Sequence, residues 1–357
     1  MEPHLHQTTK GSFEVNLLGP GDAEGVVQLF RAVYGDDYPI KLFYDPAALI
    51  TANKNGDYYS IVARTLSGEI IGIHNLFRSA PSPDVYEWGG GLVLKEWRIV
   101  GVSRAIEIVM KEKVIPELGM HTVFGEAVTI HLAMQKHGQD YGYKPTALEV
   151  GLMPGEAYTG EGVTSSRVST MMRFQVYRNI PQKIFVPATY DQALKIIYGD
   201  FNAGRTFAES LEPIPTGTVS RPPMDFFDFA KVARIAFPET GGDFAQHLSD
   251  LESEAVAKGC LVIQLSLKLT TPWIGALVEI LRERGFFLGG LLPQWFDDDG
   301  LLMQKLFFTP DFESIQLLSD NSQRIGELVE ADWRRVCRKA DHSTAATNTT
   351  GFSLNIG

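Results

Sequence analysis

The sequence predicts a mixed fold of α-helices and β-strands arranged in two domains. The chain has 357 residues, which is more than one small domain needs. Segments with a two-residue hydrophobic period alternate along it with segments of helical period. A helical segment followed by a glycine and an aromatic residue occurs twice, at Gly142-Tyr143 and at Gly285-Phe286. We therefore expect two related α/β domains.

The composition restricts the possible partners. Apolar residues make up 44% of the chain, the net charge is −11 and the pI is about 5.3. We expect neither nucleic acid nor an anionic membrane surface as a partner, because both repel an acidic protein. No long apolar run and no signal peptide is visible, so the expected localisation is cytoplasmic. Cys260 and Cys337 lack metal-ligand spacing, and we expect no metal.

The first half contains well-patterned elements. An amphipathic helix is expected over 23–34, with Asp22 as its N-cap. Another is expected from residue 102 to a stop near Pro116. The remaining expected elements are helices over 46–52 and 129–140, and strands over 13–18, 58–64, 69–78, 85–94, 122–127, 147–153 and 167–178.

The most informative stretch runs from Tyr86 to Pro116. A strand is followed by a tight turn and a helix in which Val102, Ile106 and Val109 share one face. The first N–H groups of a helix have no partner within it, and the helix dipole is positive there. The turn therefore predicts an anion-binding site.

Val93-x4-Arg98-x2-Gly101-x-Ser103 in this turn resembles the acyl-CoA pyrophosphate loop of the GCN5-related N-acetyltransferases. That loop usually reads Gln or Arg, two residues, Gly, one residue, then Gly or Ala. Ser103 is a departure, although its hydroxyl is able to donate to a phosphate. The alternative is an ordinary turn between a strand and a helix.

The order of expected elements over 13–178 is also that of this family, and it places the loop after the fourth strand, where the family carries it. The resemblance implies a mixed, mostly antiparallel sheet flanked by helices, with acetyl-CoA as cosubstrate. The residues that would contact acetyl-CoA are Leu92, Val93, Leu94, Arg98, Ile99, Val100, Gly101, Val102 and Ser103.

The resemblance also implies a general base. In the histone-acetylating branch, a glutamate lies eleven residues before the Gln or Arg that opens the loop. Glu87 precedes Arg98 by this spacing. The alternative is that Glu87 is a solvent-facing residue of a strand.

A second catalytic candidate comes from the helix that ends at Gly142. The family commonly reads Asn-x2-Ala-x3-Tyr-x3-Gly-Phe there. By this count His131 takes the Asn position, and Gly138 takes the position of the tyrosine that usually acts as general acid. Some branches have His with Gln four residues later, as His131 and Gln135 do. His131 is thus a candidate base or a pantetheine contact, or else an ordinary residue at a helix start.

Gly89, Gly90 and Gly91 lie inside the strand before the loop. Three glycines weaken a strand, which suggests a bulge or a close approach of other backbone. The family has a bulge on this strand, and its pantetheine arm bonds to the exposed backbone. The alternative is a flexible or tightly packed strand.

The segment between the first two helices lines the acceptor site in the family. Here it contains carboxylates and aromatic rings, which suit a cationic amine, although all of these are also ordinary loop residues. They are Tyr34, Asp36, Asp37, Tyr38 and Tyr44.

The second half repeats the first in divergent form. Gly151-Leu-Met-Pro154 corresponds to Gly290-Leu-Leu-Pro293. The turn over 239–243 carries acids and no base, so we expect it not to bind pyrophosphate. The expected strands are 183–186, 229–237, 259–267, 289–293 and 301–308, the helices are 187–201, 244–257, 272–284 and 321–338, and 202–223 is mostly loop.

We accordingly expect an acetyl-CoA domain over 1–180 and a degenerate copy over 181–310 that shapes the acceptor cleft or makes a homodimer contact. A C-terminal helix over 311–340 and a disordered tail over 341–357 follow. The expected function is N-acetyl transfer from acetyl-CoA to a small-molecule or peptide amine. The alternatives are a non-catalytic acyl-CoA-binding or sensor module, and a structural or interaction protein.

Overall fold

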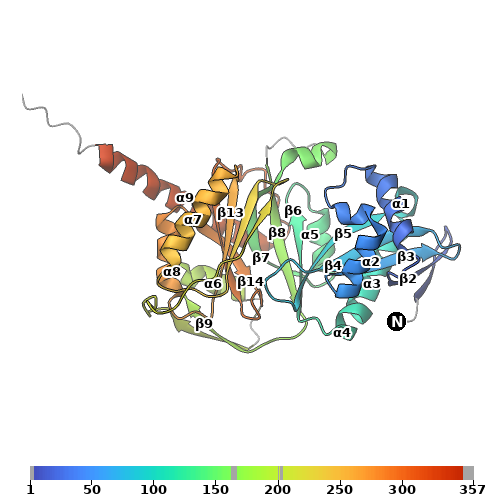
Figure 1. Ribbon diagram of the computed structural model, residues 1–357, viewed down its shortest axis with the longest axis horizontal. Helices are drawn as coiled ribbons and strands as arrows, with labels where there is room; N and C mark the ends of the chain where they lie inside the picture. The colour runs from blue at the N-terminus through green and yellow to red at the C-terminus, as the bar shows by residue number, and fades with distance from the viewer. Residues whose placement is uncertain (1–3, 162–166, 200, 202–203, 349–357) are drawn as a thin grey trace, which may run out of the picture. The chain divides into compact units, whose positions relative to one another are not determined.

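The computed structural model describes residues 4–161, 167–199, 201 and 204–348 (Figure 1). It divides into two compact units. The first unit is Met1–Gly125 with Val176–Arg178, and the second is Glu126–Gln175 with Asn179–Gly357. Each unit is mixed α/β, with mostly antiparallel strands flanked by helices. The division falls inside the predicted 1–180 domain, and that domain boundary stays a prediction.

Strands in the first unit follow the order β1-β2-β3-β4-β5-β6, all antiparallel except for the parallel pair β5–β6. β1 was not expected, because none of its residues is fully buried and it has no hydrophobic pattern. The bounds are β1 His4–Gln7, β2 Ser12–Leu17, β3 Tyr58–Thr65, β4 Ile70–Phe77, β5 Val85–Val93 and β6 Thr122–Val128.

Helices of the first unit match the predicted ones closely. α1 (Ala23–Tyr34) has the predicted bounds, and α2 (Pro46–Asn55) is one turn longer than expected. α3 (Val102–Val109) continues as a π-helical turn over Met110–Val114 and then as α4 (Ile115–Glu117). The helical path thus passes Pro116 by one residue. Short 3-10 helices lie at Lys41–Tyr44 and Lys95–Trp97.

The predicted N-cap position of α1 at Asp22 is confirmed, but the capping bond from its side chain is not. Asp22 occupies the N-cap position with helical backbone angles, and its side chain makes no cap hydrogen bond. Its carboxylate instead accepts the N–H of Gly19 at 2.6 Å and pairs with Arg64 at 2.5 Å. The carboxylate is therefore used to hold the turn before α1 against β3.

The core of the first unit lies between the sheet and the helices α1 and α2. Phe30 of α1, Leu49 of α2 and Ile73 of β4 are buried in one cluster. Along β4, Gly72 and His74 alternate with Ile73 and so face the other side of the sheet. A side chain at Gly72 would lie 2.8 Å from Val102, so α3 packs on this second face.

Strands in the second unit follow the order β8-β7-β14-β15-β13-β12-β11, and β9 and β10 form a separate parallel pair. β10 lies within the predicted loop 202–223, which was wrong over these residues. The bounds are β7 Lys144–Pro154, β8 Arg167–Val176, β9 Gln182–Val186, β10 Arg205–Glu209, β11 Met224–Phe227, β12 Val232–Phe237, β13 Val262–Lys268, β14 Phe287–Leu292 and β15 Gly300–Leu306.

Helices of the second unit include two corrections. The helix predicted over 129–140 begins four residues later, and α9 continues to Asn348 although a disordered tail was predicted from 341. Residues 349–357 of that tail lie outside the described residues. The bounds are α5 Ala133–Asp140, α6 Asp191–Tyr198, α7 Phe244–Ala257, α8 Ile274–Glu283 and α9 Asp320–Asn348, with 3-10 turns at Gly155–Glu161 and Ala188–Tyr190.

The predicted repeat corresponds to a shared order of elements within the second unit. α5, β7 and β8 follow one another as α8, β14 and β15 do, and β7 lies antiparallel beside β14. The glycines that follow the two helices, Gly142 and Gly285, both have left-handed backbone angles, with φ of 84° and 90°. Such a glycine satisfies the last carbonyls of a helix. Two tandem copies of one domain stay a prediction.

Across the part of the chain that the structure describes, no helix has both the length and the apolar character that crossing a membrane requires.

Candidate functional site

The predicted anion site lies where β5 leads into α3. Gly101 is the N-cap residue of α3 and has a left-handed backbone, with φ of 87°. No atom lies within 4 Å of the position that a side chain would take there, so the helix N-terminus is open. Arg98 is exposed, and its Nε donates to the carbonyl of Val93 at 3.1 Å. This bond holds the arginine on the loop.

The predicted cofactor residues differ in accessibility. Leu92, Val93 and Val102 are buried in the core, so only their backbone is able to contact a ligand. Exposed residues are Arg98, Ile99 and Gly101, with Ile99 at 95%. Leu94, Val100 and Ser103 are half-buried.

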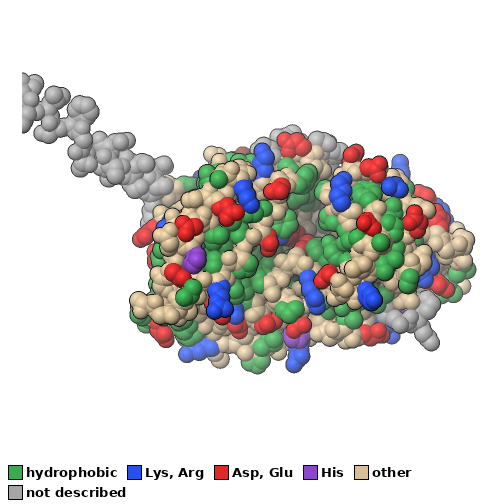
Figure 2. All heavy atoms as spheres, viewed as in Figure 1, with side chains coloured by type: hydrophobic (Ala, Val, Ile, Leu, Met, Phe, Trp, Pro, Cys, Tyr) green, Lys and Arg blue, Asp and Glu red, His purple; other side chains and the backbone are tan. Residues whose placement is uncertain are grey.

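One basic residue near the loop was missed by sequence reasoning. Lys10 lies with its ammonium 4.9 Å from the ring centre of Trp97 and donates to the carbonyl of Glu96 at 2.8 Å. Lys10 lies far from the loop in the sequence, so no motif relates it to the anion site. Figure 2 shows lysine and arginine side chains interspersed with acidic ones on the face that it draws. An anionic ligand on such a surface is bound by a local arrangement, such as a helix N-terminus.

The bulge predicted from the three glycines is confirmed. Ile73 of β4 pairs with Leu92 of β5, and Asn75 pairs with Gly89, so Gly90 and Gly91 together stand opposite one residue. Gly90 has a left-handed backbone, with φ of 59°. Its carbonyl accepts a bond from Asn75 Nδ2 at 3.1 Å. β5 therefore leaves the regular ladder directly before the loop.

Glu87 lies where the pairing of β5 with β6 ends. The parallel register runs from Val85 and Thr122 to Glu87 and Phe124. The Glu87 side chain is half-buried, and its carboxylate accepts a hydrogen bond from the hydroxyl of Ser79 at 2.7 Å. The predicted base thus stands three residues before the bulge.

Two tyrosines lie beside this carboxylate. Burial and, after it, the charge of Glu87 together raise the pKa of Tyr58 to about 12. Burial also raises the pKa of Tyr38. The neighbouring side chains of Tyr34, Tyr58 and Glu87 raise it as well, by smaller amounts. Both phenols are therefore neutral near pH 7. The ring of Tyr58 stacks on Phe77 at 5.1 Å. A carboxylate among aromatic rings suits a cationic amine.

The structure brings part of the predicted acceptor segment to Glu87. Tyr38 is the residue that it places there, with its N–H donating to the Tyr44 hydroxyl at 3.0 Å. Asp36 instead faces Arg31 at 3.4 Å, in an exposed pair. The two aspartates, Asp36 and Asp37, are both exposed.

His131 belongs to the second unit, apart from Glu87 in the division of the chain. It lies in the turn before α5 and is half-buried. Gln135, which follows His131 in the motif, is buried and forms hydrogen bonds with the segment before α9. Its Nε2 donates to the carbonyl of Gln316 at 2.7 Å, and its Oε1 accepts the N–H of Leu318 at 3.0 Å. Gln135 therefore fastens α5 to the segment before α9.

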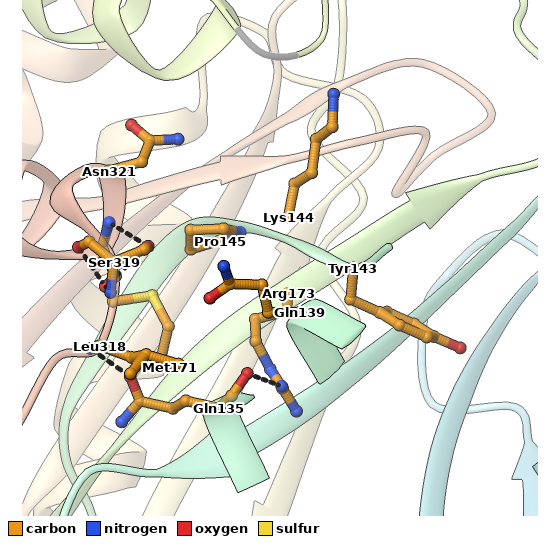
Figure 3. Close-up of a pocket in the computed structure, with 11 residues that line it drawn as sticks. Gln135, Gln139, Tyr143, Lys144, Pro145, Met171, Arg173, Leu318, Ser319 and Asn321 are labelled. Carbon is orange, nitrogen blue, oxygen red and sulfur yellow. Dashed lines mark hydrogen bonds between the residues drawn. The ribbon is translucent and has the colours of Figure 1, made fainter. Parts of the chain in front are cut away.

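Gly138, at the position of the family's acid, has no room for a side chain. A Cβ there would lie 1.8 Å from Nη1 of Arg173, a residue that is 3% exposed. This nitrogen donates to the carbonyls of Met134 and Gln135. Figure 3 shows Arg173 beside Gln135. Burial lowers the pKa of Arg173 to about 10. A cavity of about 190 Å³ lies next to it, lined also by Gln139 and Ser319.

No family model and no curated protein matches the chain. Solved structures similar to it are acetyltransferases. A ribosomal-protein-S5-alanine acetyltransferase of Vibrio fischeri is 13% identical, with a TM-score of 0.38, over 46% of this chain and 92% of that one. A spermidine/spermine N-acetyltransferase of Vibrio cholerae is 11% identical, with a TM-score of 0.37, over 46% and 92%.

A third similar structure, a putative acetyltransferase of Acinetobacter baylyi, is 14% identical with a TM-score of 0.38, over 49% of this chain and 94% of that one. All three are GCN5-type acetyltransferase structures. At these identities and TM-scores we take no activity or acceptor from them, and we argue function from the residues of the chain.

Proposed function

We propose that the chain is an acyl-CoA-dependent N-acetyltransferase, which moves an acetyl group from acetyl-CoA to an amine. The observation that carries this proposal is the course of β5. The strand ends its pairing with β6 at Glu87, bulges at Gly90 and Gly91, and leads into the open N-terminus of α3. A base, an irregular backbone and an anion site thus follow one another on one segment.

The residues present fit acyl-CoA. Its pyrophosphate would bind the first N–H groups of α3, with Gly101 leaving room and Arg98 supplying positive charge. The pantetheine arm would bond to the backbone of β5 at the bulge. Acetyl-CoA supplies the activated acetyl group, and no metal takes part in this proposal.

Glu87 is the proposed base. An ammonium group must lose a proton before it attacks, and Glu87 accepts this proton directly or through water. The amine nitrogen then bonds to the thioester carbonyl carbon, whose oxygen is stabilised by backbone N–H groups. The carbon–sulfur bond breaks, and the second proton of the nitrogen passes to the departing thiolate. The products are an amide and CoA.

The proposed acceptor is a cationic amine, either a small molecule or the amino group of a peptide. Tyr38 and Tyr58 lie beside Glu87, so an aromatic surface and a negative charge face the same place. Aromatic faces attract ammonium groups, and a carboxylate strengthens this attraction.

A non-catalytic acyl-CoA-binding or sensor module is the second candidate. The observation that favours it is Gly138, since Arg173 fills the space of the side chain that would protonate the thiolate. This candidate shares the acyl-CoA site and differs only in turnover.

Titration calorimetry with acetyl-CoA and with CoA tests the proposal. We expect one site per chain with micromolar affinity, about 8 kcal/mol. Arg98→Glu combined with Gly101→Glu should weaken binding about a hundredfold or more, because like charges face the pyrophosphate. The control is Lys113→Glu, which makes the same kind of charge change on an exposed turn of the helix. Undiminished binding by the double variant would contradict the proposed site.

An amine screen that detects free CoA separates the two candidates. Release of CoA with any amine excludes the sensor. Glu87→Gln should then keep the affinity for acetyl-CoA and lose turnover, because it removes the base without changing the loop. Binding without turnover across the screen favours the sensor.

A further inference from the structure

His74 is a polar residue beneath the bulge of β5. It lies on β4, opposite Gly90 and Gly91, and is 6% exposed. With Asn75 it interrupts an otherwise apolar strand, Ile70–Phe77. A buried polar side chain destabilises the fold unless it is hydrogen-bonded.

Hydrogen bonds connect His74 to two other elements. The indole N–H of Trp88 on β5 donates to Nδ1 at 3.0 Å, so the neutral ring carries its proton on Nε2. Nε2 lies 3.1 Å from the hydroxyl of Ser103, in the first turn of α3. That hydroxyl donates in turn to Glu107 at 3.4 Å. Ser103, expected as a phosphate donor, is thus part of an internal chain.

The imidazole also packs directly against the bulge. A Cβ at Gly91 would lie 3.0 Å from the ring, which is a tight contact that glycine avoids. The ring stacks on Trp88 at 5.9 Å with 20° between the planes. On the neighbouring position, Asn75 binds the carbonyl of Gly90. The ring of His74 therefore packs against the bulge, and the side chain of Asn75 forms a hydrogen bond with it.

We propose that His74 is a positioning residue, which fixes the bulge relative to the N-terminus of α3 through Gly91 and Ser103. This inference rests on the proposed function, in which the bulge receives the pantetheine arm and the helix receives the pyrophosphate. His74 does not contact the cofactor. It keeps the two parts of one site at a constant separation, which lowers the ordering entropy lost when a ligand spans both.

The test compares two probes by calorimetry. Acetyl-CoA spans both parts, whereas 3′-phospho-ADP carries the nucleotide without the pantetheine arm. His74→Ala and Ser103→Ala should each weaken acetyl-CoA about tenfold, the effect of losing one or two buried hydrogen bonds. Both should bind 3′-phospho-ADP within about twofold of the unmodified protein. His74→Gln, which keeps a donor and an acceptor, should recover most of the affinity.

His121→Ala is the matched control, since His121 is a half-buried histidine of the same unit that pairs with Asp84. It should leave both affinities unchanged. Equal weakening of both probes in the Ser103 and His74 variants, or unchanged acetyl-CoA binding, would overturn the positioning role. Failure of the unmodified protein to bind acetyl-CoA would instead overturn the proposed function, so the two results are distinguishable.

Discussion

Single residues of the second unit include a buried carboxylate with an unusual environment. Glu149 on β7 is 2% exposed and accepts hydrogen bonds from Thr170 at 2.6 Å and from Gln264 at 2.8 Å. Arg234 lies between Glu149 and Glu126, at 3.3 Å and 2.9 Å. Burial and, after it, the charge of Glu126 raise the pKa of Glu149 to about 7, although the charge of Arg234 lowers it. One arginine thus serves two carboxylates.

This pKa predicts a pH-dependent stability. A glutamate whose folded pKa is raised binds a proton more tightly in the folded state than in the unfolded state. Its contribution to the stability of the fold is therefore present below the unfolded pKa, near 4.3, and is lost as pH rises through about 7. Glu149→Gln does not ionise. Its free energy of unfolding should therefore gain on that of the unmodified protein by about 1–3 kcal/mol between pH 4 and pH 8.

Urea unfolding at the two pH values measures this gain. Glu330→Gln, on a partly exposed part of α9, is the control and should show no pH-dependent difference. A constant difference between Glu149→Gln and the unmodified protein would show that folding does not change the pKa of Glu149.

Sequence spacing predicted Glu87 and the loop residues as a site, because both follow fixed distances along one segment. It did not find His74. A lone histidine in an apolar strand is usually an ordinary core residue, and its partners, Trp88 and Ser103, come from other elements. The sequence does contain a signal for His74, namely a His-Asn pair in an apolar strand near three glycines. The pairing register of the two strands is needed to place this histidine opposite the glycines.

At the scale of single helices and strands, α5 contains a glycine that a larger residue should not be able to replace. Ala is a better helix former than Gly, so Gly138→Ala in an open helix would stabilise it by up to about 1 kcal/mol. Here the new methyl group would overlap the guanidinium of Arg173, which is held by two carbonyls of the same helix. We expect Gly138→Ala to destabilise the protein by about 1–3 kcal/mol.

Thermal unfolding with Gly217→Ala as control measures this effect. No atom lies within 4 Å of a side chain built at Gly217, so its substitution should be nearly neutral. A gain in stability for Gly138→Ala would mean that Arg173 moves aside freely.

Elements with a strong apolar period were predicted to the residue, as α1 and α7 were. β1, β10 and β11 were missed, because none of their residues is fully buried and so the burial gives no pattern to follow. The start of α5 was placed too early. Thr129, taken as its first residue, is tied to β8 by two bonds to the carbonyl of Ser169, and these compete with helix formation.

At the scale of the whole molecule, α9 connects several segments of the second unit. Asp332 of α9 is 4% exposed and pairs with Arg282 of α8. It also accepts the hydroxyl of Tyr190 at 2.8 Å and the N–H of Leu288 at 2.9 Å. Burial raises the pKa of Tyr190 further above its usual value, and Asp332 adds to this. One carboxylate thus joins three other segments of the chain to α9.

Asp332→Ala should therefore destabilise the second unit by about 3–5 kcal/mol, since it leaves a buried arginine without its partner. Chemical denaturation measures the loss. Glu330→Ala removes an exposed pair with Arg334 on the same helix and should cost less than about 0.5 kcal/mol. Similar effects of the two substitutions would contradict the role of Asp332.

The division of the whole chain into units was beyond sequence reasoning. Residues 176–178 leave the segment 126–175 and return to the first unit, where the N–H groups of Tyr177 and Arg178 bond to the carbonyl of His121. Hydrophobic period predicts elements but not which earlier segment a later one joins. The expected boundary near 180 lies directly after the stretch 13–178 that resembles the family.

This return of 176–178 has a consequence for synthesis on the ribosome. His121 and Arg178 are 57 residues apart, which is several seconds of translation at roughly 5–20 residues per second. The first unit therefore lacks residues 176–178 until the intervening segment 126–175 has been translated. The second unit is incomplete for longer, until α9 has been translated. A nascent chain that stalls before residue 320 would leave Arg282 and the backbone N–H of Leu288 on β14 without Asp332, and it would be a client for chaperones.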